Sequence, residues 1–102
     1  MLVRIWRTSF DVSRKNKLVD YATGTSLPVL SSRPGNRGVI FYSDGDQWTT
    51  LTVWENRQAI DRLDDDPEYA RIVDGIMALG VLGNDQDTAV FAYEGGAFGP
   101  NA

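Results

Sequence analysis

The sequence predicts an α+β domain in which one face of a four-stranded antiparallel sheet carries two helical regions. Three observations predict it. Strand-like and helix-like segments follow one another in the order β, α, β, β, α, β. A short Asp-Gly-Asp turn separates the two central strand-like segments. The chain has 102 residues, a usual length for one domain.

The first strand and the first helix come from the amino-terminal third of the chain. Residues 2–8 mix β-branched and aromatic side chains with charges, which favours a strand. Residues 13–30 carry apolar side chains at helical spacing and predict one amphipathic helix. Pro28 would collide with the carbonyl of Gly24, four residues earlier, so we expect the helix to kink or restart there.

A reversal and a hairpin follow. Residues 31–38 are rich in serine, proline and glycine and predict a turn. Two strands are expected at residues 38–43 and 47–55. The Asp-Gly-Asp segment between them can adopt the positive φ angles of a tight hairpin.

The second helical region is split, and a last strand follows it. Asn56 is suited to cap a short helix through Leu63. Asp66, followed by Pro67, is typical of a second helix start, and that helix should run to about residue 79. Residues 87–93 predict the last strand. The complete order is that of a ferredoxin-like βαββαβ fold.

The strands are apolar on both faces of the predicted sheet. Residues 39–42 and 89–93 are apolar at successive positions, which point to opposite faces. The helices suffice to cover one face, and an exposed second face would be a larger apolar patch than soluble monomers tolerate. We therefore predict a two-fold homodimer in which sheet packs against sheet, with Phe41 and Phe91 as probes of the interface.

Composition excludes several classes of function. Ten Lys and Arg against fourteen Asp and Glu give a net charge of −4, which argues against nucleic acid or an anionic membrane as partner. No apolar run is long enough to span a membrane. The chain has no His and no Cys, so it lacks the usual metal and haem ligands and the base of Ser-His catalysis. We expect a cytoplasmic protein without a metal or other cofactor.

Alternation along the third strand predicts a candidate ligand site. It places Trp48, Thr50, Thr52 and Trp54 on one face. If this face meets the helices, two indoles and two hydroxyls would line a cleft suited to a flat aromatic ligand. Two ordinary interpretations stay open: Trp54 as a core residue that holds the strand against the short helix, and the threonines as good strand formers.

Charged and phenolic side chains could complete that site. Arg4 and Arg7 interrupt an apolar first strand and must be paired or solvated. Either could stabilise a phenolate or enolate, or form a salt bridge to an acidic residue. Tyr69 is one of four tyrosines that could donate to a ligand oxygen, although buried tyrosines usually have structural partners.

Two charged loops have ordinary explanations. Arg33 and Arg37 flank a turn whose spacing matches no phosphate-binding motif, so we expect a solvated loop. The acidic run at residues 64–66 lacks the ligand spacing of a calcium loop, and helix capping explains it.

Three segments carry a resemblance to a known family. They are Pro-Gly-Asn-Arg-Gly at residues 34–38, Leu-Thr-Val-Trp-Glu-Asn at 51–56 with Gln-Ala-Ile at 58–60, and Pro-Glu-Tyr at 67–69. Over residues 2–94 the chain resembles the antibiotic-biosynthesis-monooxygenase-like (ABM) group of the dimeric α+β barrel proteins. We therefore expect one domain through residue 94 and a flexible tail at residues 95–102.

The resemblance implies a function. Such proteins join two sheets into a barrel and leave a cleft between sheet and helices in each subunit, and some oxygenate aromatic polyketides without metal or flavin. It implies a cofactor-independent monooxygenase acting on an aromatic or quinone-forming small molecule; the alternative is a non-catalytic ligand-binding or structural dimer. The candidate catalytic residues are Arg7, Trp54 and Tyr69, and the candidate substrate-binding residues are Trp48, Thr50 and Thr52.

Haem degradation, which close relatives of that family perform, is not expected. Those relatives use a histidine on the second main helix, a tryptophan on the preceding short helix and an asparagine on the first strand. The matching positions here are Val73, Leu63 and about Arg7.

Overall fold

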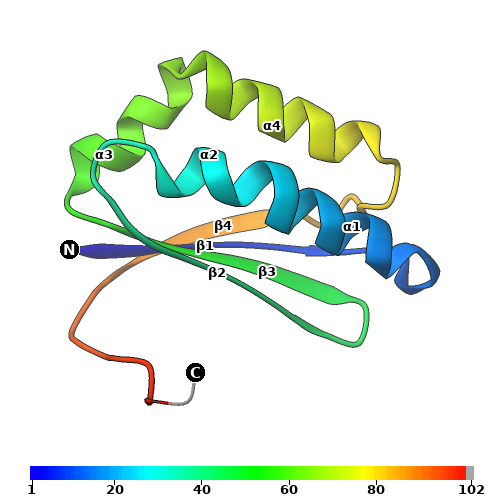
Figure 1. Cartoon of the computed structure of the whole chain (residues 1–102), viewed down its shortest axis with the longest axis horizontal. Coiled ribbons are helices and arrows are strands. Elements are labelled where there is room, and N and C mark those ends of the chain that lie inside the picture. The colour runs from blue at the N-terminus through cyan, green and yellow to red at the C-terminus, as the bar shows by residue number, and fades with distance from the viewer. Residues whose placement is uncertain (101–102) are drawn as a thin grey trace.

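The strands form one antiparallel sheet, and every helix lies on the same face of it (Figure 1). A computed structural model describes residues 1–100; the last two residues of the expected tail, 101 and 102, lie outside the described residues. The strand order is β2-β3-β1-β4. The strands are β1 (Leu2–Ser9), β2 (Asn36–Asp44), β3 (Gln47–Trp54) and β4 (Asp87–Ala92). This confirms the predicted α+β class and ferredoxin-like order.

The helices fall into two groups, which connect β1 to β2 and β3 to β4. The first group is a 3₁₀ turn (Val12–Arg14), α1 (Lys15–Tyr21), a π-helical turn (Ala22–Ser26) and α2 (Leu27–Ser31). The second is α3 (Arg57–Asp61), a 3₁₀ turn (Arg62–Asp65) and α4 (Pro67–Ala78). The predicted split of the second helical region is confirmed.

The π-helical turn is the local consequence of Pro28. The N–H of Leu27 donates to the carbonyl of Ala22, five residues earlier, instead of four. Proline has no N–H to donate, and its ring crowds the carbonyl four residues back. A wider turn relieves that crowding, and α2 restarts with Pro28 in its first turn. The predicted interruption is therefore present, as a change of helical pitch.

Two glycines allow the sharp reversals. Gly35 has a φ of 83°, and a Cβ there would lie 2.6 Å from the Cβ of Ala59, so a larger residue is excluded by both conformation and space. Gly45 has a φ of 57° and is the first of the two residues between β2 and β3. Glycine at that position suits a tight two-residue hairpin.

The strand register decides which side chains meet the helices. Arg4 pairs with Thr52 and Val90, whereas its neighbour Val3 pairs with Val53 and Phe91. Directly paired residues share a face, so Arg4 and Val3 lie on opposite faces. The helix-covered face is called the inner face below, and the uncovered one the outer face.

The two phenylalanines proposed as interface probes lie on opposite faces. Phe91 lies on the outer face and is 52% exposed. Phe41 pairs with Thr50 and packs on the buried Trp48 with ring centroids 5.8 Å apart, which places it on the inner face. The expectation that Phe41 lies at a sheet-to-sheet interface is therefore wrong. Its strand is apolar on both faces, and the sequence did not determine which face it takes.

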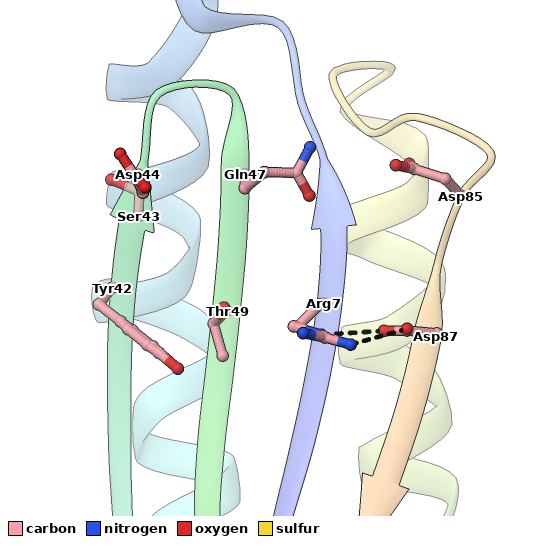
Figure 2. A pocket seen from close by; sticks show the side chains of 8 residues that line it. All are labelled: Arg7, Tyr42, Ser43, Asp44, Gln47, Thr49, Asp85 and Asp87. Atoms are coloured by element: carbon pink, nitrogen blue, oxygen red, sulfur yellow. Dashed lines mark hydrogen bonds and ion pairs between the residues drawn. The ribbon is translucent and has the colours of Figure 1, made fainter.

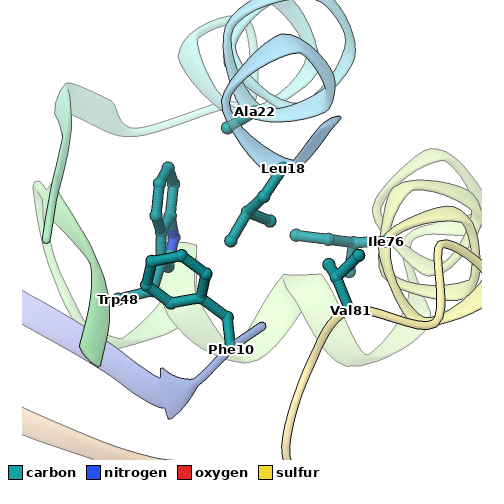
Figure 3. Close-up of a cluster of buried hydrophobic side chains, with 6 residues drawn as sticks. All are labelled: Phe10, Leu18, Ala22, Trp48, Ile76 and Val81. Atoms are coloured by element: carbon teal, nitrogen blue, oxygen red, sulfur yellow. The ribbon is translucent and has the colours of Figure 1, made fainter. Parts of the chain in front are cut away.

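The core lies between the inner face and the helices (Figure 3). Its larger cluster joins side chains of both layers: Phe10, Leu18, Ala22, Trp48, Ile76 and Val81. The rings of Phe10 and Trp48 meet edge to face at 6.1 Å. A second cluster packs the completely buried Trp54 against Ala59, Ile60 and Leu63.

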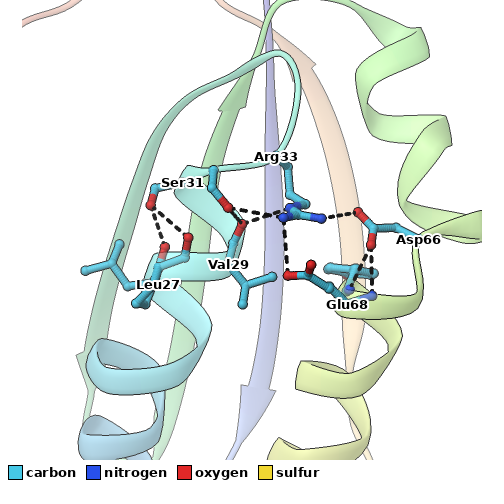
Figure 4. A network of polar contacts seen from close by, with 9 residues as sticks. Leu27, Val29, Ser31, Arg33, Asp66 and Glu68 are labelled. Atoms are coloured by element: carbon cyan, nitrogen blue, oxygen red, sulfur yellow. Dashed lines mark hydrogen bonds and ion pairs between the residues drawn. The ribbon is translucent and has the colours of Figure 1, made fainter.

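Arg33 joins the two helical groups (Figure 4). Its side chain is only 17% exposed, and its Nη1 donates to Oδ2 of Asp66 at 2.9 Å while its Nε donates to the carbonyl of Val29 at 3.1 Å. Asp66 also accepts from the N–H groups of Glu68 and Tyr69 and so caps α4, as predicted. The expectation of a solvated Arg33 is wrong, because Asp66, which caps α4, lies next to the end of α2.

The ion pair makes stability depend on pH through Asp66. The hydrogen bond from Arg33 holds the pKa of the Asp66 carboxyl below its ordinary value of 3.8. A group whose folded pKa is lowered stabilises the fold above its unfolded pKa, and this contribution is lost as the pH falls through the folded value. Asp66→Asn removes the charge but keeps an oxygen that can cap the helix.

We expect the parent chain to be more stable than Asp66→Asn at pH 7 in urea titrations. The difference should start to shrink below about pH 5 and go on shrinking through about pH 3. Asp64→Asn is the control, because Asp64 is exposed and has no ion pair within residues 1–100. A difference that stays constant with pH would contradict the assignment.

Candidate functional site

A cavity of about 270 Å³ lies between the inner face of the sheet and the helices. Its walls are mainly aromatic and aliphatic and come from both layers; they include Trp6, Phe41, Trp48, Tyr69, Ile72 and Ile76. Its volume is just below the usual range of small-molecule sites, about 300–1,000 Å³. The cavity therefore suits a small, flat, largely apolar ligand.

A larger hollow of about 540 Å³ lies on the outer face and differs in chemistry (Figure 2). It is lined mainly by polar and charged side chains, among them Arg7, Asp44, Asp85 and Asp87. Arg7 Nη2 donates to Oδ2 of Asp87 at 3.1 Å, and both side chains are 59% exposed. That hydrogen bond raises the pKa of the Arg7 guanidinium above its ordinary value. A polar surface hollow is a poorer site for an aromatic ring than the largely apolar cavity between sheet and helices.

Arg7 does not share the cavity with the other predicted site residues. It pairs with Thr49 and Asp87 on the outer face, so it belongs to the polar hollow. Its guanidinium donates to the carboxylate of Asp87, which is the salt-bridge alternative. The sequence left open which face Arg7 takes.

Four of the predicted residues do come together around the cavity: Trp48, Thr50, Thr52 and Tyr69. Trp54 does not line it. It is completely buried in the second core cluster beside α3, as the structural alternative for this residue predicted.

The two threonines of β3 are hydrogen-bond partners of the two indoles. Nε1 of Trp48 donates to Oγ1 of Thr50 at 3.1 Å, and Nε1 of Trp54 donates to Oγ1 of Thr52 at 2.8 Å. The Thr52 hydroxyl in turn donates to the carbonyl of Arg4 at 3.4 Å. Thr50 has no acceptor for its hydroxyl hydrogen within residues 1–100. Thr50 therefore remains able to donate to a ligand.

Arg4 and Trp6 are site residues that the sequence did not single out as a pair. Both lie on the inner face of the central strand β1 and line the cavity. The guanidinium carbon of Arg4 lies 6.0 Å from the centre of the Tyr69 ring, a cation-π arrangement. The sequence signal for this pair is the alternation of side chains along β1, which places Arg4 and Trp6 on one face of the sheet and Arg7 on the other.

Among the tyrosines, Tyr69 is the one that lines the cavity. The hydroxyl of Tyr21 donates to the carbonyl of Ile72 at 2.9 Å and joins α1 to α4, and burial raises its pKa. The hydroxyl of Tyr93 donates to the carbonyl of Gly96, and Tyr42 lines the outer hollow. Tyr69 has no hydrogen-bond partner for its hydroxyl among residues 1–100.

The cavity contains hydrogen-bond donors but no acidic side chain. Its lining includes Arg4 and several hydroxyl and indole groups, and no Asp or Glu. Across residues 1–100, no cluster of three or more His, Cys, Asp or Glu side chains could hold a metal ion. In the same part of the chain, no helix is both long and apolar enough to cross a membrane. The arrangement can hold an aromatic ring system and stabilise negative charge on its oxygens.

The fold is similar to that of solved antibiotic biosynthesis monooxygenases. A monooxygenase from the gene ActVA-Orf6 of Streptomyces coelicolor, in complex with the ligand nanaomycin D, matches with a TM-score of 0.79 and 22% identity, over 96% of this chain and 91% of that one. A candidate antibiotic biosynthesis monooxygenase from Deinococcus radiodurans matches with a TM-score of 0.76 and 13% identity, over 96% of this chain and 97% of that one. SnoaB, a cofactor-independent oxygenase from Streptomyces nogalater, matches with a TM-score of 0.75 and 11% identity, over 93% of this chain and 94% of that one.

No protein-family model and no curated protein sequence matches the chain. The similarity therefore lies in the structure. It confirms the ABM-like fold that the three sequence segments indicated, and it extends over more than nine-tenths of the chain.

The Trp54–Thr52 pair should behave as one structural unit. Trp54→Phe leaves a buried hydroxyl without its donor, and Thr52→Val leaves a buried indole N–H without its acceptor, so each should cost about 1–3 kcal/mol of unfolding free energy. The double variant should cost less than the sum, since it leaves neither group alone. Urea titration followed by circular dichroism measures all three. Additive costs would show that the hydrogen bond contributes nothing.

Proposed function

We propose that this protein is a monooxygenase that oxidises an aromatic or quinone-forming small molecule in the cavity between sheet and helices, without a metal or organic cofactor. One observation carries the proposal: an aromatic-walled cavity whose lining contains a guanidinium together with hydroxyl and indole donors and has no acidic side chain. The fold shared with a cofactor-independent oxygenase, and with a monooxygenase that holds a ligand, supports it. A chain without cysteine suits a reducing compartment, and we place the activity in the cytoplasm.

The chemistry needs a substrate that supplies all the electrons. An anthrone is an example: deprotonation gives an enolate, which is electron-rich enough to transfer electrons to dioxygen. Its ring methylene then becomes a carbonyl, so one oxygen atom enters the product and the other leaves as water with the two methylene hydrogens. No external reductant is required. The proton goes to water, because the lining of the cavity contains neither a carboxylate nor a histidine.

Three residues would carry the site's contribution to this reaction. Arg4 supplies positive charge where the enolate oxygen develops negative charge. The hydroxyls of Thr50 and Tyr69 are positioned on the lining to donate to the same or a second oxygen. A bound aromatic ring between the apolar walls would displace water, which would strengthen these interactions.

The proposed active form is a homodimer formed through the outer face of the sheet. This face carries exposed apolar side chains on both edge strands: Ile40 and Tyr42 on β2, 36% and 46% exposed, and Phe91 on β4, 52% exposed. No helix of residues 1–100 covers it (Figure 1). The charged pair Arg7–Asp87 on this face is neutral as a unit. A second copy that presents the same face would bury both apolar surfaces in a two-fold arrangement.

Oxygen uptake tests the activity. With a panel of naphthols, anthrones and catechols, we expect saturable uptake for at least one compound. Tyr69→Phe should lower kcat/KM about tenfold to a thousandfold, because it removes one donor to the developing charge. Tyr93→Phe is the matched control, since its hydroxyl contacts the tail outside the cavity. No turnover of any compound would leave the non-catalytic dimer as the explanation. Equal loss in both variants would exclude the role of Tyr69.

Light scattering after size exclusion tests the dimer. The parent chain should have twice the mass of one chain, and Phe91→Asp should give a monomer or an aggregate, since two carboxylates would be buried in each interface. Phe98→Asp is the control, because Phe98 is 73% exposed in the tail after β4. An unchanged dimer with Phe91→Asp would contradict the proposed interface.

A further inference from the structure

We propose that the ligand of the cavity is a planar aromatic anion, such as an aromatic carboxylate, and that Arg4 selects it by binding its anionic oxygens. The inference deepens the proposed function and rests on its placement of the ligand in this cavity. It does not depend on the oxidation chemistry.

Arg4 is a cation without an acidic partner. Four other arginines form ion pairs within residues 1–100: Arg7, Arg33, Arg37 and Arg57. In the same part of the chain no carboxylate lies within salt-bridge distance of Arg4, and its side chain donates no hydrogen bond. Its guanidinium lies over the ring of Tyr69. A guanidinium on the covered face of a central strand is costly to desolvate unless something else compensates its charge.

The surroundings of Arg4 would favour an anion over a neutral ligand. The lining of the cavity has no Asp or Glu, so the site carries a local positive charge in a protein whose net charge is −4. The aromatic and aliphatic walls lower the local dielectric constant, which strengthens an ionic contact. A guanidinium presents two parallel N–H groups to a carboxylate, so it also favours a defined orientation.

Neighbouring groups would complete the recognition. Trp6 and Thr50 are paired residues on adjacent strands, and both line the cavity beside Arg4. Neither the Trp6 indole N–H nor the Thr50 hydroxyl hydrogen has an acceptor within residues 1–100. No buried side-chain polar atom of these residues lacks a partner, so the Trp6 indole N–H reaches accessible space. Thr50 is half-buried on the lining of the cavity. The two donors can serve a second oxygen of the ligand while the aromatic walls hold its rings.

The outer hollow does not compete for such a ligand. Its arginine, Arg7, is already bound to Asp87. Asp44 and Asp85 also line the hollow, so its lining carries more carboxylates than guanidinium groups and repels anions. A measured preference for an anion can therefore be assigned to the cavity and to Arg4.

The experiment compares 2-naphthoate with 2-naphthamide, which have the same ring system and differ in charge. Isothermal titration at pH 7 should show naphthoate binding about tenfold or more tightly than naphthamide, the effect of a charge-assisted hydrogen bond to a desolvated group. In Arg4→Gln this ratio should fall to about one, and in Arg4→Lys naphthoate should stay preferred. Arg71→Ala is the control: it removes the same charge from an exposed position on α4 and should keep the ratio.

Each result decides the proposal. Equal affinity of the parent chain for both compounds, saturable binding of neither, or a ratio unchanged in Arg4→Gln would overturn it. If Arg4→Gln fails to fold, as judged by circular dichroism, the parent ratio and Arg4→Lys still test it. Binding with the expected preference but no oxygen uptake would support this inference and reject the oxygenase. Oxygen uptake from neutral phenols without any preference for an anion would support the oxygenase and reject this inference.

Discussion

The structure depends on one constraint: the helices cover only one face of a sheet that is apolar on both. Each strand residue therefore lies in one of two environments, and neighbours along a strand lie in different ones. On β1 the inner environment receives Arg4 and Trp6, and the outer one receives Ile5 and Arg7. The inner environment contains a largely apolar cavity whose lining has one charged side chain, Arg4, and the outer environment is a surface that no helix of residues 1–100 covers.

The cavity exists because the two layers are linked at separate points and do not collapse onto each other between them. The buried cluster around Trp48 joins them at one end, and the cluster around Trp54 at the other. Within the helical layer, Arg33 holds the end of α2 to the start of α4, and the Tyr21 hydroxyl holds α1 to α4. Tyr69, in the first turn of α4, is placed over Arg4 as a result. The same contacts that stabilise the fold thus position the candidate site.

The fold is shared with oxygenases, but a fold can serve many functions, so the side chains of this cavity must carry any specific claim. The Thr52 hydroxyl accepts a hydrogen bond from Trp54 and donates one to the backbone carbonyl of Arg4. The Thr50 hydroxyl accepts a hydrogen bond from Trp48, and its own hydrogen is free to be donated to a ligand. In an ordinary core every polar group has a partner inside the protein. Arg4 has no ion-pair partner within residues 1–100, and this difference supports the proposed site for an oxygen anion.

The sequence by itself determined the features that depend on neighbours along the chain. Helical and strand periodicity gave the element order, Asp66 before Pro67 marked the start of α4, and Pro28 marked an interruption of the first helix. The face taken by each strand was decided only by the tertiary structure. Arg7 therefore lies opposite the other candidate site residues, Phe41 lies on the inner face and not at the expected interface, and Arg33 has a partner 33 residues away. The physical reason is that alternation separates two sets of residues, but where both sets are apolar only long-range packing decides which set meets the helices.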